Sequence, residues 1–124
     1  MAEQPAKAAA PATADELEWS PTLNNEQRMS YDDAVKACKK LGKGYRLPTV
    51  QELLGTVDYT RQNPAIDIER LPDTKSGPYW SGTPVAWASR AAWVVLFDFG
   101  GSVVYFRGYD DAFVRAVRSV PAGQ

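Results

Sequence analysis

The 124-residue sequence contains no histidine and only one cysteine, Cys38. The lack of histidine removes the most common general base, the usual partner in a nucleophilic triad and a frequent transition-metal ligand. One cysteine cannot form an internal disulfide, whereas small extracellular scaffolds usually carry several. We therefore expect a protein that is not an enzyme, that binds no metal or other cofactor, and that is made in a reducing cytoplasm.

Neither sign of charge is in excess, because 14 basic and 15 acidic residues leave a net charge of −1. A general nucleic-acid binder needs a basic face, and so does a protein attracted to anionic membranes. No apolar run approaches the ~20 residues that span a bilayer. The N-terminus lacks the basic start and apolar block of a secretory signal. We expect neither nucleic acid nor a membrane among the partners.

The N-terminal residues have a composition that predicts an extended arm outside the folded domain. Residues 1–17 are rich in alanine and proline and carry few large apolar side chains to offset the entropy of ordering. Since a chain of this length holds one core, we place the domain at residues 18–120 and a short tail at residues 121–124. The arm is either a disordered leader or is ordered by a neighbouring subunit. In the second case we expect residues 1–28 to mediate assembly into a homo-oligomer or a virion.

Two helices are expected in the first half of the domain. Residues 31–41 carry an apolar stripe at helical spacing, and Ser30 is placed to cap their N-terminus. A shorter helix follows before Gly55, where Thr49 and Glu52 have the spacing of a capping box.

Strands are expected around and after a long irregular region at residues 56–77. Residues 19–23 form a short extended segment in which Pro21 limits pairing. The adjacent glycines at positions 100 and 101 predict a two-residue hairpin turn. The expected strands of one antiparallel sheet are residues 79–82, 92–99, 102–107 and 113–117, with 92–99 in the centre because it is apolar on both faces. The fold class is α+β: two helices, an irregular loop region and an antiparallel sheet.

Five motifs occur in an order that resembles the DUF1566 family, the family of the C-terminal domain of the Legionella collagen-like adhesin. They are A-x-x-x-C-x-x-L (34–41), G-Y-R-L-P-T-V-Q-E-L (44–53), Y-W-S-G-T (79–83), A-W-V-V-x-F (92–97) and F-V-R-A-V-R (113–118). The resemblance spans about residues 18–119 and implies a C-type-lectin-like fold. That fold is similar to the formylglycine-generating-enzyme-like folds, which include the variable ligand-binding proteins of diversity-generating retroelements. In those proteins a fixed scaffold displays a variable aromatic and polar surface near the C-terminus.

The sequence departs from the family pattern in two ways. Many secreted members carry a second cysteine where this chain has Ala116, so Cys38 is expected to be a buried, unpaired thiol. The enzyme branch of the fold uses active-site cysteines that this chain lacks, so the resemblance carries no activity over.

Ten of the fourteen aromatic residues lie between Gly77 and Ser119. Those within the motifs suit a core, and we expect Trp80, Trp93, Phe97 and Phe113, together with Phe106, to hold the domain together. The same motifs contain arginines whose five donors suit the pinning of irregular loops. The expected structural residues are Arg46 (with Glu52 as its partner), Trp80, Trp93, Arg115 and Arg118.

The residues between the motifs are candidates for an exposed, ligand-facing surface. Tryptophan, tyrosine and arginine dominate binding hot spots, and rigid aromatic side chains offer contact area at a low entropic cost. The resemblance also implies that these intervening positions face a ligand. The candidate ligand-binding residues are Trp87, Ser89, Arg90, Phe99, Tyr105, Arg107, Tyr109 and Asp110.

Two acidic groups suggest other chemistries. Asp110 and Asp111 could bind calcium, but calcium takes six or more oxygen ligands, and an isolated acidic pair favours a turn. Asp67, Glu69 and Asp73 could supply the two carboxylates of a glycosidase, but they lie in a loop without distinctive spacing.

We expect a non-enzymatic recognition domain that binds a protein or a glycan. Its expected location is the surface or tail of a phage virion assembled in the cytoplasm, with a cytosolic protein as the alternative. A second interpretation is a structural decoration protein whose N-terminal arm docks on a neighbouring subunit.

Overall fold

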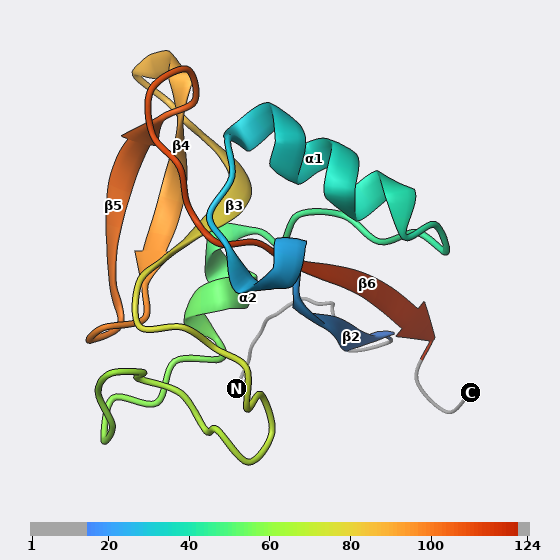
Figure 1. Ribbon diagram of the computed structural model, residues 1–124, viewed down its shortest axis with the longest axis vertical. Coiled ribbons are helices and arrows are strands. Elements are labelled where there is room, and N and C mark those ends of the chain that lie inside the picture. Colours follow the sequence, from blue (N-terminus) through green and yellow to red (C-terminus); the bar gives the residue numbers. More distant parts are fainter. Residues whose placement is uncertain (1–14, 122–124) are drawn as a thin grey trace, which may run out of the picture.

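The computed structural model describes residues 15–121, which form an α+β fold (Figure 1). In chain order its elements are β2 (Asp15–Thr22), the 3-10 turn η2 (Asn24–Glu26), α1 (Tyr31–Lys40), α2 (Val50–Leu54), β3 (Pro78–Val85), β4 (Ala88–Leu96), β5 (Gly101–Phe106) and β6 (Arg115–Pro121). Residues 15–17 of the expected arm are the first residues of β2. The rest of the arm, and residues 122–124 of the tail, lie outside the described residues. None of the helices within residues 15–121 is long and apolar enough to cross a bilayer.

The strands form two sheets, and the prediction of one sheet was wrong. β3, β4 and β5 form a three-stranded antiparallel sheet, while β2 and β6 pair antiparallel in a separate sheet. The first and last strands of the described chain therefore lie side by side (Figure 1). The register of β2 shifts between Trp19 and Thr22, around Pro21, which agrees with the expected effect of that proline on pairing.

Both predicted helix caps are present. The Ser30 hydroxyl accepts a hydrogen bond from the Asp33 N–H at 3.2 Å. Thr49 and Glu52 form a complete capping box at the start of α2. Each cap satisfies a backbone donor that the first turn of the helix would otherwise leave unpaired.

The two helices cover opposite faces of the three-stranded sheet. One core cluster joins α1 to Trp80 and Val94, and the other joins α2 to Tyr79 and Val95. Successive side chains of a strand point to opposite faces, so these alternating contacts place α1 on one face and α2 on the other. The strand predicted at residues 92–99 corresponds to β4, which lies between β3 and β5, so its predicted central position is confirmed.

The boundaries of all five strands differ from the prediction, and β4 and β6 show why. β4 runs from Ala88 to Leu96, and the turn after it comprises the four residues Phe97–Gly100 rather than two glycines. Phe97 leaves the ladder with β5 because its buried ring packs on the α2 side and its N–H donates to the Gly77 carbonyl. The last strand begins at Arg115 rather than at residue 113, because Phe113 instead forms an isolated parallel bridge with Tyr79.

Candidate functional site

The predicted ligand-binding residues lie at two ends of the three-stranded sheet. The β3–β4 turn, Ala86–Trp87, is at one end, where Arg90 and Arg107 also face each other across β4 and β5. The β4–β5 turn, which contains Phe99, is at the opposite end (Figure 1). The structure therefore separates Phe99 from the other candidates.

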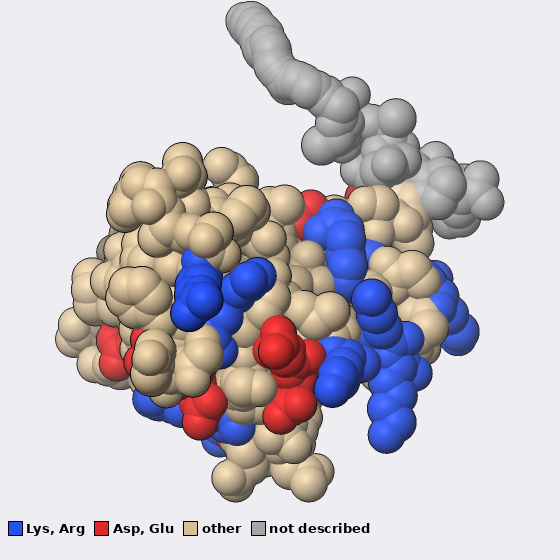
Figure 2. All heavy atoms as spheres, turned by 90° about the horizontal axis from the view of Figure 1, so that it is seen from above, with Lys and Arg blue, Asp and Glu red and all other residues tan. Residues whose placement is uncertain are grey.

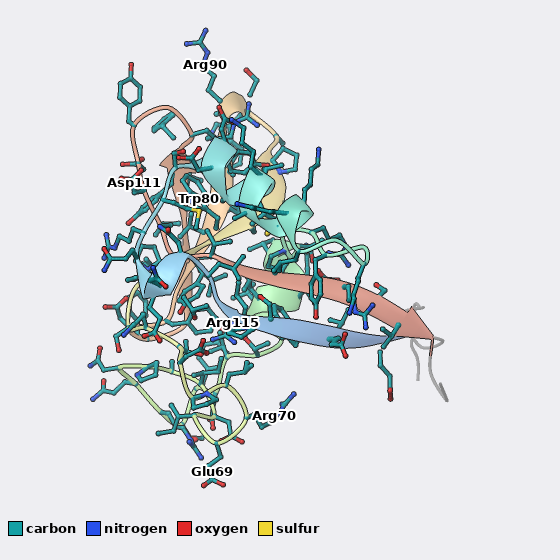
Figure 3. The ribbon with its side chains drawn as sticks, turned by 45° about the vertical axis from the view of Figure 1, so that its right-hand side comes forward. Glu69, Arg70, Trp80, Arg90, Asp111 and Arg115 are labelled. Carbon is teal, nitrogen blue, oxygen red and sulfur yellow. The ribbon has the colours of Figure 1, made fainter. Side chains whose placement is uncertain are left out.

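Five of the candidates form an exposed group at the β3–β4 end, which we call the rim: Trp87, Ser89, Arg90, Arg107 and Tyr109. All five are exposed, with 73% of Trp87 and 90% of Tyr109 accessible to solvent. Neither rim arginine makes an ion pair with another residue of 15–121. Arg90 points away from the body of the domain, at the end opposite Glu69 and Arg70 (Figure 3).

Contacts with the scaffold position Arg107 within the rim. Its backbone N–H donates to the Arg90 carbonyl at 2.8 Å, and its guanidinium carbon lies 4.9 Å from the centre of the Tyr31 ring. This cation–π distance is favourable. The Tyr31 ring in turn packs edge-on against Trp80, with ring centres 5.4 Å apart. The guanidinium is therefore held against the core while still facing solvent.

Two further candidates, Tyr105 and Asp110, are partly buried and make contacts within the fold. Tyr105 is partly buried and packs edge-on against Trp80, with ring centres 6.0 Å apart. The Asp110 carboxylate accepts a hydrogen bond from the Phe106 N–H at 2.8 Å and so closes the turn after β5. This contact agrees with the interpretation of Asp110 and Asp111 as turn residues rather than calcium ligands.

Sequence reasoning reversed the two faces of β5. It placed Phe106 in the core and Tyr105 outside, whereas Phe106 is 49% exposed and Tyr105 packs under α1. Residues that alternate along a strand must face alternate sides, so Tyr105 on the α1 side places Phe106 on the other. The alternation of residues 102–106 shows that Tyr105 and Phe106 face opposite sides of the sheet. The sequence does not show which of these two sides α1 covers.

The exposed aromatic surface continues from the rim along the α2 side of the sheet. Trp87 packs edge-on against the half-buried Trp93, with ring centres 5.8 Å apart. Val104 lies opposite Trp93 in the ladder, and Phe106 lies opposite Ala91. We call Trp87, Trp93, Val104 and Phe106 the aromatic face. Trp93 was predicted as a core residue and is only partly inside; Trp80 and Phe97 are fully buried, as predicted, and Phe113 is partly buried.

The rim is a surface rather than a pocket. In the view onto this end of the domain, a broad uncharged area lies beside a few basic and acidic side chains, and no single sign of charge covers the face (Figure 2). Three surface hollows of about 230 to 510 Å³ are lined by residues around α1, α2 and β2, and not by the rim residues. Such a surface suits an extended ligand better than an enclosed small molecule.

The arginines that were predicted to be structural each have partners. Arg46 donates two hydrogen bonds to Glu52, at 2.8 and 2.9 Å, so the predicted partnership is confirmed. Partial burial disfavours the Glu52 carboxylate, but hydrogen bonds from Arg46 and the Thr49 N–H outweigh this and lower its pKa. Arg118 pairs with Glu18 and lies over the Tyr45 ring.

Arg115 has a different and buried environment. Its guanidinium donates to the carbonyl of Ser20, the hydroxyls of Thr22 and Thr74, and the carboxylate of Asp73. The sequence suggests Asp73 only as a possible catalytic acid, and no spacing pattern indicates that it pairs with Arg115, 42 residues later. Burial opposes the Asp73 charge, but donors from Thr22 and Arg115 lower its pKa. Its position is therefore that of a structural counter-ion.

The described residues offer little reactive chemistry outside these pairs. Within residues 15–121 no group of three or more histidine, cysteine, aspartate or glutamate side chains is arranged to hold a metal ion. Cys38 is buried, and burial raises the pKa of its thiol to about 12. The rim can thus stack, donate hydrogen bonds and attract anionic groups.

The family model described as the Lcl C-terminal domain matches residues 12–118 of the chain. This range includes both helices, both sheets apart from the last residues of β6, and the whole rim. A search of the curated proteins finds no match.

Proposed function

The chain belongs to the Lcl C-terminal domain family, and we propose that it is a non-enzymatic recognition domain with a C-type-lectin-like fold. Its ligand is a protein or a glycan, bound at the rim and the adjoining aromatic face. The fold assignment is supported by the order of elements, since two helices precede a long irregular region and a three-stranded antiparallel sheet.

One observation carries the proposal: large aromatic side chains lie at the same end of the three-stranded sheet as two guanidinium groups that make no ion pair within residues 15–121. Trp87 and Tyr109 are the two most exposed large apolar residues in the described chain. Trp87 precedes Arg90 by three residues, Tyr109 follows Arg107 by two, and the backbones of the two arginines are hydrogen-bonded. Exposed aromatic surface lowers the solubility of a protein, and exposed apolar patches surrounded by polar residues mark interaction sites. Arg90 lies in β4, and Trp87, Arg107 and Tyr109 lie in the turns that directly adjoin β3, β4 and β5. Anchoring by the sheet lowers the entropy that these side chains lose when a ligand binds.

A comparison of binding by two triple variants tests the proposal. The probes are a printed glycan array and intact bacterial cells, with and without protease treatment. The rim variant carries Trp87→Ala, Arg90→Ala and Tyr109→Ala. We expect wild-type protein to bind one probe and the rim variant to bind it at least about tenfold more weakly, since hot-spot truncations cost about 2 kcal/mol or more each.

The control variant removes exposed side chains elsewhere on the domain. It carries Leu41→Ser and Ile68→Ser, together with Lys36→Ala on α1; all three side chains are exposed. This variant should bind like wild type, and both variants should melt close to wild type. Equal binding by the rim variant, or equal losses in both variants, would contradict the proposal. Sensitivity to protease would identify a protein ligand, and signals on the array a glycan.

The place of action is a separate proposal. We propose that the domain is displayed on a phage virion, which is supported by the single buried thiol, because folding needs no disulfide. Mass spectrometry and immuno-electron microscopy of purified particles test this directly. Detection on a tail or shell would support it, and detection only in the soluble cytosolic fraction would contradict it.

A further inference from the structure

β5 is an edge strand without the usual protection against pairing. It lies at the outer side of the three-stranded sheet, and no other described element lies beyond it (Figure 1). Edge strands normally carry charged residues or proline that discourage the addition of another strand. The sequence of β5, Gly-Ser-Val-Val-Tyr-Phe, has neither. Other strands at the sides of the two sheets do have them: Glu16, Glu18 and Pro21 in β2, Pro78 and Pro84 in β3, and Arg118 in β6.

Apart from the exposed Ser102, the side chains of β5 are apolar on both faces and only partly covered. Val103 and Tyr105 pack on the α1 side, and Val104 and Phe106 lie on the α2 side. Phe106 is exposed and the other three are partly buried. A strand that is apolar on both faces is typical of a central position in a sheet. The composition of β5 therefore suits a strand with a neighbour on each side.

The hydrogen-bonding pattern shows which backbone groups face outward. The Arg107 N–H donates to the Arg90 carbonyl, so these two residues form a hydrogen-bonded pair. Such pairs alternate along an antiparallel ladder, so residues 101, 103 and 105 bond to β4, while residues 102, 104 and 106 direct their peptide groups away from it.

Two of the three outward-facing residues have free peptide groups. The Phe106 N–H donates to the Asp110 carboxylate, and its carbonyl accepts from the N–H groups of Tyr109 and Asp110. The N–H and carbonyl groups of Ser102 and Val104 form no hydrogen bond with any other residue in the range 15–121. The edge therefore presents two donors and two acceptors, and Asp110 closes it at Phe106.

We propose that β5 pairs with β5 of a second copy of this chain, antiparallel, about a two-fold axis at Val103. In this register Ser102 of each copy lies opposite Val104 of the other. Each of these two residue pairs exchanges two hydrogen bonds, which uses every outward donor and acceptor of Ser102 and Val104. A two-fold axis at Val104 would instead place Ser102 opposite Phe106, whose groups are already bonded to the turn. The edge is thus complementary to itself in one register.

Charge and shape at the ends of β5 favour a second copy as the occupant. The antiparallel register brings the Arg107 end of one copy to the β4–β5 turn of the other, which carries Asp98. Neither side chain makes an ion pair within residues 15–121, so the two opposite charges complement each other across the interface. The exposed Phe99 in the same turn approaches Phe106 of the other copy. This places Phe99, isolated from the rim within one chain, beside the aromatic face of the second.

Pairing at β5 does not depend on the proposed ligand-binding function. The pairing joins the three-stranded sheets of the two copies into one sheet of six strands. It places the rims of the two copies at opposite ends of that sheet. The dimer would be present in protein without a ligand, so its absence would leave the rim proposal unaffected.

Disulfide trapping of Val103→Cys tests the register. Two residues that face each other at a non-hydrogen-bonded position have α-carbons about 4.5 Å apart, within the range of a disulfide. Oxidised glutathione accepts the two electrons of the new bond, and the native Cys38 is buried. We expect a disulfide-linked dimer from Val103→Cys and only monomer from Ser119→Cys, an exposed position on β6. Failure of Val103→Cys to cross-link, or equal cross-linking of both variants, would overturn the proposal.

Sedimentation of Val104→Pro over a range of concentrations tests the edge itself. The Val104 N–H points outward, so proline removes no bond within the chain but blocks the interface. We expect wild type to dimerise and the proline variant to have a dimer dissociation constant at least about tenfold higher. Val104→Lys should act in the same direction without changing the backbone. Wild-type protein that is monomeric throughout, or a dimer that both variants retain, would overturn the proposal.

Discussion

The guanidinium of Arg115 lies 2.6 Å from the carboxylate of Asp73, and only 4% of the Arg115 side chain is exposed. Arg115 begins β6, and Asp73 lies 42 residues earlier, in the irregular region. The same guanidinium also bonds to the Ser20 carbonyl in β2. One buried cation therefore fixes a long loop to the sheet formed by the first and last strands (Figure 3). This relationship explains how a region with no regular structure can be part of a rigid domain.

Replacement of Asp73 by alanine should lower the free energy of unfolding by about 3–5 kcal/mol, because it leaves the Arg115 charge buried and uncompensated. Urea denaturation measures the loss. Asp67→Ala is the matched control, since Asp67 pairs with Arg61 at 3.6 Å on the surface. An exposed pair is worth only about 0–1 kcal/mol. Similar losses in the two variants would show that the buried pair has no special role.

Stability should fall in acid, in part through Asp73. The native-state pKa of this carboxyl is held below its ordinary value of 3.8. A carboxyl with a depressed pKa contributes stability above its unfolded-state value, and the contribution disappears as the pH falls through the native-state value. The stabilisation should therefore be complete near neutrality and decline below about pH 4.

Urea melts of wild type and Asp73→Asn across this range measure the effect. The asparagine variant should be less stable at neutral pH and should lose less stability on acidification. Parallel curves would contradict the assignment of the acid sensitivity to Asp73.

Trp80 and Trp87 should differ sharply when each is replaced by alanine. Trp80 is completely buried, packs edge-on against Tyr31 and Tyr105, and donates its indole N–H to the Met29 carbonyl at 2.8 Å. Its loss should cost about 3–5 kcal/mol. Trp87 is mostly exposed, and its loss should change stability by about 0.5 kcal/mol or less. Thermal melts of the two variants compare them, and large losses in both would contradict the exposure of Trp87.

Cys38 should resist thiol reagents in the folded protein. Burial raises the pKa of the thiol to about 12, so almost no thiolate is present at mildly alkaline pH. Ellman's reagent should label it only after denaturant is added. Rapid labelling of the native protein would show that the thiol is accessible and would reopen a chemical role for it.

Features set by neighbours in the sequence could be predicted. The caps at Ser30 and Thr49 and the Arg46–Glu52 pair depend on residues within six positions of one another. The central position of β4 follows from its apolar character on both faces. In each case the interaction is short-range, so the residue types and their spacing are sufficient.

Features set by distant packing could not be predicted. The pairing of β2 with β6 joins the two ends of the domain, and the Asp73–Arg115 bond spans the irregular region. Placing Phe99 at the rim failed because the sequence does not show at which end of the sheet each turn lies. Reversing Tyr105 and Phe106 failed because the cover supplied by α1 comes from another part of the chain.

Hydroxyl-radical footprinting of the bound domain shows whether the rim is the surface that contacts the ligand. The exposed aromatic residues Trp87 and Tyr109 lie on the rim, whereas Tyr59 lies against Gly100 in the turn at the opposite end. With a bound cell surface or glycan, we expect reduced oxidation of Trp87 and Tyr109 and unchanged oxidation of Tyr59. Protection of Tyr59 with continued oxidation of Trp87 and Tyr109 would contradict it, because the ligand would then bind away from the rim.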